Sequence, residues 1–172
     1  MFSNDFKEDL KRYPKRAFLK EQSVWSIALY RLARSVNQRG ESLLNSLFNI
    51  VYWPLFRLVE TITGVSLPKD AQIGPGLRIW HFGNIFVNSK SIIGENCTLR
   101  QGVTIGNRHE DGPAPVIGNN VNFGAYAQVL GNIKIGNNVN IGAMSVVLID
   151  VPDNSTVAGV PAKIVKSVSN PA

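Results

Sequence analysis

Apolar side chains recur every six residues through the second part of the sequence, and this period restricts the fold more than any other feature. The positions are Leu67, Ile73, Ile79, Ile85, Ile93, Leu99, Ile105, Ile117, Phe123, Val129, Ile135, Ile141 and Val147. An α-helix repeats every ~3.6 residues and a flat strand every ~2, so neither produces this period. A parallel coil does, because each hexad supplies one short strand and one corner, and three hexads complete a turn. The sequence therefore predicts a triangular, stacked parallel coil.

The hexads share further features. Glycine often follows the apolar residue, as at Gly118 and Gly136, and the fifth position is usually small or branched. Corners need conformations or close approaches that a side chain would obstruct, which favours glycine there. A slip of two residues precedes Ile93 and a polar insertion follows Ile105, yet the period returns in phase at Ile117.

The residues before Leu67 follow helical spacing instead. Apolar residues line one helix face in 24–33, and a second helical pattern starts at Leu43 and is expected to be disturbed at Pro54. We expect three parts: a helical cap at 1–66, the coil at 67–166 and a C-terminal tail at 167–172.

The stretch 43–62 is the one candidate for a membrane span. It contains Arg57 and Glu60, which a span would bury at high cost. We expect amphipathic helices packed on the rest of the protein, with peripheral membrane attachment through Trp53, Phe56 and nearby bases as the alternative.

Composition limits the classes of binding partner and the cellular compartment that we expect. The net charge of +6 favours an anionic partner, such as nucleic acid, an acidic membrane or a phosphorylated cofactor. The basic residues are scattered, which argues against nucleic acid, and the spacing of histidine, cysteine and carboxylates indicates no metal site. The single cysteine, Cys97, excludes an intramolecular disulfide and is expected in the core. The polar, acid-containing N-terminus is unlike a secretory signal, so a cytoplasmic protein is expected.

The run GVTIGNRHEDGPAPVIGNNVNFGAYAQVLGNIKIGNNVNIGAMSVVLIDVPDNSTVAGVPAKIV resembles the serine acetyltransferase branch of the hexapeptide-repeat acyltransferases. It is similar above all to the short members of that branch that act in colanic acid and exopolysaccharide biosynthesis. The likeness is strong over 67–166 and loose over 1–66. It implies a mainly β protein, a left-handed parallel β-helix with a short N-terminal α-helical cap. It also implies acetyl-CoA as co-substrate and a homotrimer with active sites between neighbouring coils.

By this resemblance, His81 matches the catalytic histidine of the family, and an imidazole is suited to act as a base near neutral pH. The alternative is a surface histidine without a role. Trp80 stands where serine acetyltransferases carry an aspartate, so another group must orient His81. A backbone carbonyl or a neighbouring subunit is one source of that group. The candidate carboxylates are Asp5, Glu8, Asp9 and Asp70.

The insertion GNRHEDGPAP contains Arg108 and His109. Serine acetyltransferases place a second, substrate-contacting histidine just before the proline of this region, where this chain has Ala114. That difference argues against serine as the acceptor. The resemblance implies that Arg108 and His109 contact the acceptor, and the alternative is an ordinary solvated loop.

Pantetheine needs a smooth edge of the coil, and coenzyme A phosphates need cations. The resemblance implies that both are found here, with backbone amides along the edge polarising the thioester. The residues expected to bind acetyl-CoA are Thr104, Gly124, Ala125, Gly142, Ala143, Lys163 and Lys166. For the small residues, a structural corner is the alternative role, and for the lysines a solvated basic tail.

Three functions are weighed. The first is an acetyl-CoA-dependent O-acetyltransferase acting on a sugar or glycan hydroxyl in surface polysaccharide biosynthesis, in the cytoplasm or at the inner face of the membrane. The second is serine O-acetyltransferase of cysteine biosynthesis. The third is a non-catalytic hexapeptide-repeat assembly subunit.

Overall fold

A computed structural model describes residues 4–38 and 43–167, so most of the tail expected at 167–172 lies outside the described residues. The helices are α1 (Asn4–Lys11), α2 (Ala17–Lys20), α3 (Ser23–Asn37) and α4 (Leu43–Thr63). The strands are β1 (Val65–Ser66), β2 (Gln72–Ile73), β3 (Arg78–Trp80), β4 (Ile85–Val87), β5 (Ile92–Ile93), β6 (Thr98–Arg100), β7 (Thr104–Gly106), β8 (Val116–Ile117), β9 (Asn122–Phe123), β10 (Gln128–Leu130), β11 (Lys134–Ile135), β12 (Asn140–Ile141), β13 (Val146–Val147), β14 (Ser155–Gly159) and β15 (Ala162–Ser167). The first strand thus begins two residues before Leu67.

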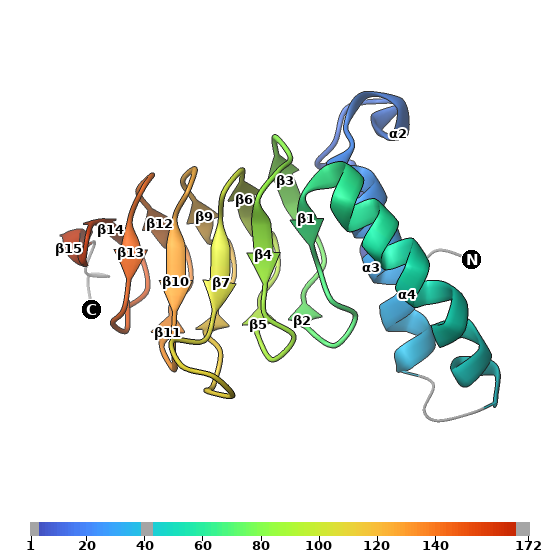
Figure 1. Ribbon diagram of the computed structural model, residues 1–172. Coiled ribbons are helices and arrows are strands. Elements are labelled where there is room, and N and C mark those ends of the chain that lie inside the picture. The colour runs from blue at the N-terminus through green and yellow to red at the C-terminus, as the bar shows by residue number, and fades with distance from the viewer. Residues whose placement is uncertain (1–3, 39–42, 168–172) are drawn as a thin grey trace.

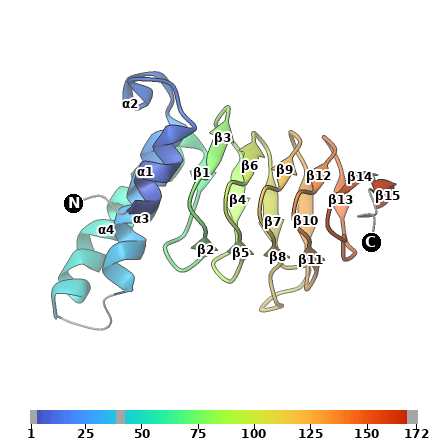
Figure 2. The same cartoon turned by 180° about the vertical axis from the view of Figure 1, so that it is seen from behind.

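The strands form three parallel sheets that are the faces of one prism (Figure 1). Sheet A has the order β1-β4-β7-β10-β13, sheet B the order β11-β8-β5-β2, and sheet C the order β14-β12-β9-β6-β3, with β15 added antiparallel to β14. As the chain advances from the helices toward β15 it winds in a left-handed sense (Figures 1 and 2). The prediction of a left-handed parallel β-helix is confirmed.

The six-residue period sets the register between rungs. Ile79 pairs with Leu99 in sheet C, and Val129 pairs with Ile105 and Val147 in sheet A. These side chains point into the prism and are almost completely buried. Each such aliphatic residue contributes about 1.5–3 kcal/mol of burial free energy, so stacking like residues builds a continuous core.

The corner between sheets B and C is built by asparagine. Asn96, Asn120, Asn138 and Asn154 all have φ near +56°, a left-handed conformation that asparagine tolerates better than most residues. Their side chains also form a ladder: Asn120 donates to Asn138 at 3.0 Å, and Asn138 donates to Asn154 at 2.9 Å. The asparagines of this corner therefore serve both the turn and the contact between rungs.

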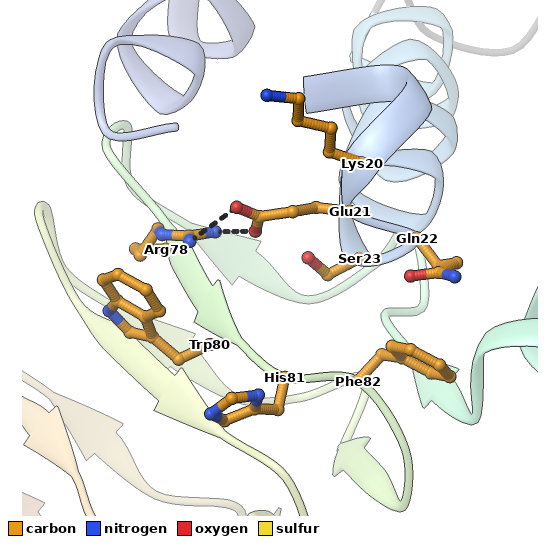
Figure 3. Close-up of a pocket in the computed structure, with 8 residues that line it drawn as sticks. All are labelled: Lys20, Glu21, Gln22, Ser23, Arg78, Trp80, His81 and Phe82. Atoms are coloured by element: carbon orange, nitrogen blue, oxygen red, sulfur yellow. Dashed lines mark hydrogen bonds and ion pairs between the residues drawn. The ribbon is translucent and has the colours of Figure 1, made fainter. Parts of the chain in front are cut away.

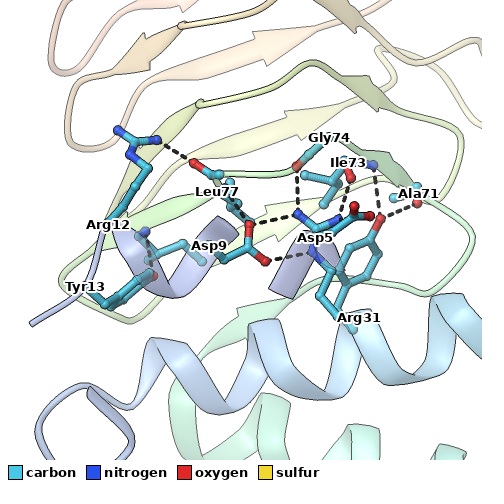
Figure 4. A network of polar contacts seen from close by, with 12 residues as sticks. Asp5, Asp9, Arg12, Tyr13, Arg31, Ala71, Ile73, Gly74 and Leu77 are labelled. Carbon is cyan, nitrogen blue, oxygen red and sulfur yellow. Dashed lines mark hydrogen bonds and ion pairs between the residues drawn. The ribbon is translucent and has the colours of Figure 1, made fainter. Parts of the chain in front are cut away.

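Helices α1 and α3 close the open end of the coil (Figure 4). Buried Arg31 of α3 donates to the carbonyl oxygens of Ile73 and Gly74, at 2.6 and 2.7 Å. Asp9 of α1 accepts from the amide of Leu77 at 2.7 Å, and the two side chains form a bidentate ion pair with each other. Unpaired backbone groups at a buried strand edge are costly, so these contacts stabilise the first rung.

Helix α4 differs from the sequence prediction. It runs through Pro54 to Thr63 without interruption, although Pro54 was expected to disturb it. The buried side chains of Tyr52 and Phe56 pack with Leu29 of α3, and this packing offsets the missing backbone hydrogen bond. Burial also removes Phe56 from the surface that was considered for peripheral membrane attachment. Among the residues that the structure describes, no helix is both long and apolar enough to cross a membrane.

Candidate functional site

His81 lies in a pocket of about 270 Å³ where the cap meets the coil. Figure 3 shows two walls: the connection from α2 into α3 forms one, and the end of β3 with the turn after it forms the other. The lining residues are Lys20, Glu21, Gln22, Ser23, Arg78, Trp80, His81 and Phe82. A concave site with an exposed imidazole is a natural place for proton-transfer chemistry.

The backbone at His81 is unusual. His81 has φ of 61° and Asn84 has φ of 54°, with Gly83 at 106° between them. A non-glycine residue in this region is uncommon and is kept only where its surroundings determine it. The turn places the imidazole outside the prism, and in the described part of the chain this side chain has no hydrogen-bond partner.

None of the four carboxylates proposed to orient His81 lines this pocket. Asp9 is fully buried and is bound by Arg31, while Glu8 pairs with Lys11. Asp5 lies 3.7 Å from Arg31, and Asp70 accepts a hydrogen bond from Asn37. The structure does not support Asp9 as the orienting candidate, because its carboxylate accepts from the Leu77 amide at the open strand edge.

The carboxylate that lines the pocket is instead Glu21, which was not among the candidates. It forms two contacts with the Arg78 guanidinium, one of them from Nη2 at 3.0 Å. The guanidinium lies between two aromatic rings, 3.9 Å from the centroid of Tyr13 and 4.1 Å from that of Trp80. Guanidinium groups stack well on aromatic faces, so Arg78 fixes the position of Trp80.

The turn containing His81 joins β3 to β4, at the corner between sheets C and A. The next three rungs place their own connections on the same corner: Gln101 and Gly102, then Ala125 and Tyr126, then Ala143 and Met144. Backbone hydrogen bonds join these rungs, from Gly102 to Gly83, from Tyr126 to Gln101, and from Met144 to Ala125. His81 and four of the small residues predicted for pantetheine, namely Gly124, Ala125, Gly142 and Ala143, therefore share one corner.

Close packing explains the glycines at this corner. A side chain on Gly124 would place its Cβ 2.7 Å from the Cα of Ala143, and one on Gly142 would meet Ala158 at 3.0 Å. Ala158 in turn pairs with Lys163 across β14 and β15. Gly124, Ala143, Gly142 and Lys163 thus form one continuous edge, and Lys166 lies exposed further along β15.

The corner also carries two large residues that the sequence interpretation missed. Tyr126 and Met144 both have φ of 59° and both are exposed, and the Tyr126 ring lies against Gly102. Their place in the hexad, one residue after Ala125 and Ala143, was the available signal. The edge is therefore smooth at the alanines and bounded by larger side chains.

Arg108 and His109 lie elsewhere. Their loop joins β7 to β8 at the corner between sheets A and B, at the bottom of the coil in Figure 1, whereas the His81 turn lies at the top. Both residues are exposed, and the Arg108 stem lies over Gly131, where a Cβ would come within 2.7 Å of its Cδ. Thr104 lies on the face of sheet A, paired with Phe86 and Gln128. Within one chain these groups do not share the corner of His81.

Known proteins are similar to this chain in sequence. The family model described as bacterial transferase hexapeptide (six repeats) matches residues 114–148. The protein named colanic acid biosynthesis acetyltransferase WcaB of Escherichia coli K12 is 40% identical over 141 residues, which cover 80% of this chain and 87% of that protein. Serine acetyltransferase of Synechococcus elongatus is 42% identical over 113 residues, 64% of this chain but 46% of that protein. The chain therefore spans about half the length of this serine acetyltransferase.

Solved structures of serine acetyltransferases have the same fold. That of Neisseria gonorrhoeae superposes with a TM-score of 0.81 at 32% identity, covering 97% of this chain and 64% of that one. That of Brucella abortus, in complex with coenzyme A, has a TM-score of 0.78 at 30% identity, covering 96% and 66%. The match extends over the cap as well as the coil.

Proposed function

Because the chain belongs to the hexapeptide-repeat acyltransferases, the family of the serine acetyltransferases and WcaB, we propose that it transfers an acetyl group from acetyl-CoA to a hydroxyl of a sugar or glycan intermediate in surface polysaccharide biosynthesis. One observation carries the proposal. His81 and the row of small residues from Ala125 to Ala143 lie on the same corner of the coil. A thioester lying along that corner would bring its carbonyl carbon to the histidine.

In this proposal His81 is the general base. It takes the proton of the acceptor hydroxyl as the hydroxyl oxygen attacks the thioester carbonyl carbon. The tetrahedral intermediate then breaks the carbon–sulfur bond, and the imidazolium returns the proton to the thiolate of coenzyme A. Backbone amides along the corner are the available donors for the oxyanion. The products are the acetyl ester and free coenzyme A.

The corner suits an extended donor. Three rung steps separate the His81 turn from Ala143, which is about 14 Å at ~4.8 Å per step. Gly124 and Gly142 let adjacent rungs approach closely, so no side chain projects from the edge at these two positions. Lys163 stands exposed at the far end, and Lys166 lies exposed three residues further along β15, opposite Thr156 in sheet C. Point charges at these places would attract the phosphates of coenzyme A.

The predicted acceptor-contacting residues require a second copy of the chain. Arg108 and His109 lie on a corner different from that of His81, so a neighbouring subunit must supply them if they act there. A homotrimer, in which each site lies between two coils, meets this requirement. A water-excluding tunnel between coils would also strengthen the electrostatic stabilisation of the intermediate.

Serine O-acetyltransferase is the second candidate, and the likeness to solved serine acetyltransferases favours it. Trp80 and Ala114 weigh against it, because serine acetyltransferases carry an aspartate and a histidine at these places. A non-catalytic assembly subunit is the third candidate. It would require no function for His81.

The test is an acetyl-transfer assay that follows release of the coenzyme A thiol. Nucleotide sugars and oligosaccharides are compared with L-serine as acceptors, for the intact chain and for His81→Ala. Loss of a general base lowers the rate by about 10²–10⁴-fold, and circular dichroism checks that the variant folds. His109→Ala removes the other imidazole of the chain, and its predicted contact with the acceptor should raise KM for the acceptor while leaving kcat nearly unchanged. If His81→Ala acetylates every accepted compound at the original rate, His81 is not the base. If the intact chain acetylates none of the compounds, the assembly role replaces the proposal.

A further inference from the structure

We propose that the pocket beside His81 is a subsite for a single pyranose ring, in which Trp80 forms the wall that stacks on the sugar. The inference rests on the proposed function and identifies the group that selects the acceptor. Trp80, Gln22 and Lys20 are assigned to acceptor recognition, and His81 to the chemistry.

The first argument is the exposure of Trp80. Its neighbours in β3, Arg78 and Ile79, are buried, but Trp80 itself is 48% exposed. Phe82, on the other side of His81, is also exposed, so two aromatic side chains flank the imidazole (Figure 3). Large apolar surface beside a polar cavity is a feature of ligand sites.

The second argument is that Trp80 is held in place. The Arg78 guanidinium lies 4.1 Å from its ring centroid, and Arg78 is fixed in turn by Glu21 and by the ring of Tyr13. Arg78 also donates to the carbonyl of Ile79 at 3.0 Å. A wall fixed in this way loses little conformational entropy when a ligand binds.

The third argument is the chemistry of the two walls. Trp80 and Phe82 are flat and apolar, whereas Lys20 and Gln22 on the opposite wall carry hydrogen-bonding groups (Figure 3). A pyranose ring has the same division, with C–H groups on its faces and hydroxyl groups around its edge. Its faces therefore fit the aromatic wall while its hydroxyls reach the polar wall and His81.

The size of the pocket and the charges of its lining residues restrict the class of ligand further. The volume of about 270 Å³ lies just below the ~300–1,000 Å³ of pockets for drug-sized molecules, which suits one sugar ring. The carboxylate of Glu21 is already paired with Arg78, and Lys20 adds a positive charge. An ammonium group, such as that of serine, would find no free carboxylate among the residues that line this pocket.

Binding is tested separately from catalysis. Saturation-transfer NMR is recorded with methyl pyranosides of the gluco, galacto, manno and fuco series and with L-serine. The proteins are the intact chain, His81→Ala, Trp80→Ala and Trp80→Phe, with Trp53→Ala as the control. Trp53 matches Trp80 in exposure, 47% against 48%, but lies on α4. At least one pyranoside is expected to bind through its ring protons to the intact chain, His81→Ala and the Trp53 control.

Trp80→Ala is expected to weaken that binding at least tenfold, and Trp80→Phe is expected to restore most of it. In the transfer assay, Trp80→Ala should raise KM for the sugar at least tenfold and change KM for acetyl-CoA less than twofold. Unchanged sugar binding in Trp80→Ala, or binding of L-serine with no pyranoside bound, would overturn the subsite. Ring binding without acetyl transfer would leave the subsite standing and remove the proposed function, so the two failures are distinct.

Discussion

Glu21 and Arg78, separated by 57 residues in the chain, form an ion pair at the wall of the His81 pocket, with Arg78 Nη2 3.0 Å from Glu21 Oε1. The pair joins the α2–α3 connection of the cap to strand β3 of the coil. Arg78 is almost completely buried, whereas Glu21 keeps some contact with solvent. The geometry of the pocket thus depends on a link between the two parts of the chain.

Glu21→Gln should therefore affect stability and acceptor binding together. Removing the charge leaves a buried guanidinium without its counter-ion, which we expect to lower the free energy of unfolding by ~2 kcal/mol, less than the ~3–5 of a fully buried pair. It should also loosen Trp80 and raise KM for the acceptor. Urea unfolding and steady-state kinetics measure the two effects. The control is Glu60→Gln, which breaks the pair with Arg57. The Arg57 side chain is 71% exposed and stays solvated, so this variant should change neither quantity appreciably.

The ion pair of Asp9 and Arg31 should be the most sensitive polar contact of the cap. Asp9→Asn removes the charge opposite a buried guanidinium that also binds two carbonyl oxygens of the first rung. We expect a loss of ~3–5 kcal/mol in the free energy of unfolding. Asp5→Asn is the control, because Asp5 lies 3.7 Å from the same guanidinium but is half exposed. Equal effects of the two substitutions would contradict the edge-capping role.

The polar contacts between the cap and the coil could not be predicted from the sequence, whereas the coil itself could. The coil was predictable because one apolar residue per hexad must point inward at every rung, and Ile79, Leu99 and Phe123 do so. Family resemblance supplied the left-handed sense, which the period alone leaves open. Asp9 was only one of four candidates for orienting His81. Its actual contact, with the amide of Leu77 68 residues away, has no local signature in the sequence.

The candidate site likewise contains residues that the sequence predicts and residues that it does not. Ala125 and Ala143 were predicted to line one edge because they are small and match the cofactor slot of the family, and the structure stacks them in successive turns on the corner of His81. Glu21 was missed, since its relation to His81 arises only when the cap folds against β3. Periodic features are visible in a sequence, whereas contacts between the cap and the coil depend on tertiary packing.

Cys97 should be unreactive in the folded protein. Burial raises the pKa of its thiol to about 11 from an ordinary value of 9.0, so almost no thiolate exists at pH 8. Labelling with a thiol-specific disulfide reagent should proceed only as fast as the chain opens, and unfolding in urea should make it rapid. Because the folded pKa is raised, the stabilisation from this thiol is full below pH 9 and decreases as the pH rises toward 11. Cys97→Ala should lack that component of the pH dependence.

Gly124 and Gly106 occupy the same hexad position but should tolerate alanine differently. A Cβ on Gly124 would lie 2.7 Å from the Cα of Ala143 in the next rung, whereas one on Gly106 would meet only the end of Leu130, at 3.8 Å. Gly124→Ala must therefore separate two rungs and should lower the melting temperature by several degrees. Gly106→Ala should leave it nearly unchanged. Similar melting temperatures for the two variants would show that the rungs are not closely packed at Gly124.

Substitution of Lys163 tests whether bound acetyl-CoA extends along the corner from His81 as far as β15. Lys163→Gln removes an exposed positive charge beside Ala158, and Lys134→Gln, on sheet B, removes one away from this corner. Loss of one charge-assisted contact to phosphate corresponds to ~1.5–3 kcal/mol, so we expect KM for acetyl-CoA to rise about tenfold or more in Lys163→Gln only. The acceptor KM should stay within twofold of its original value in both variants. If Lys134→Gln raises KM for acetyl-CoA as much as Lys163→Gln does, the effect is a general one of net charge. The phosphates would then have to bind elsewhere than beside Lys163.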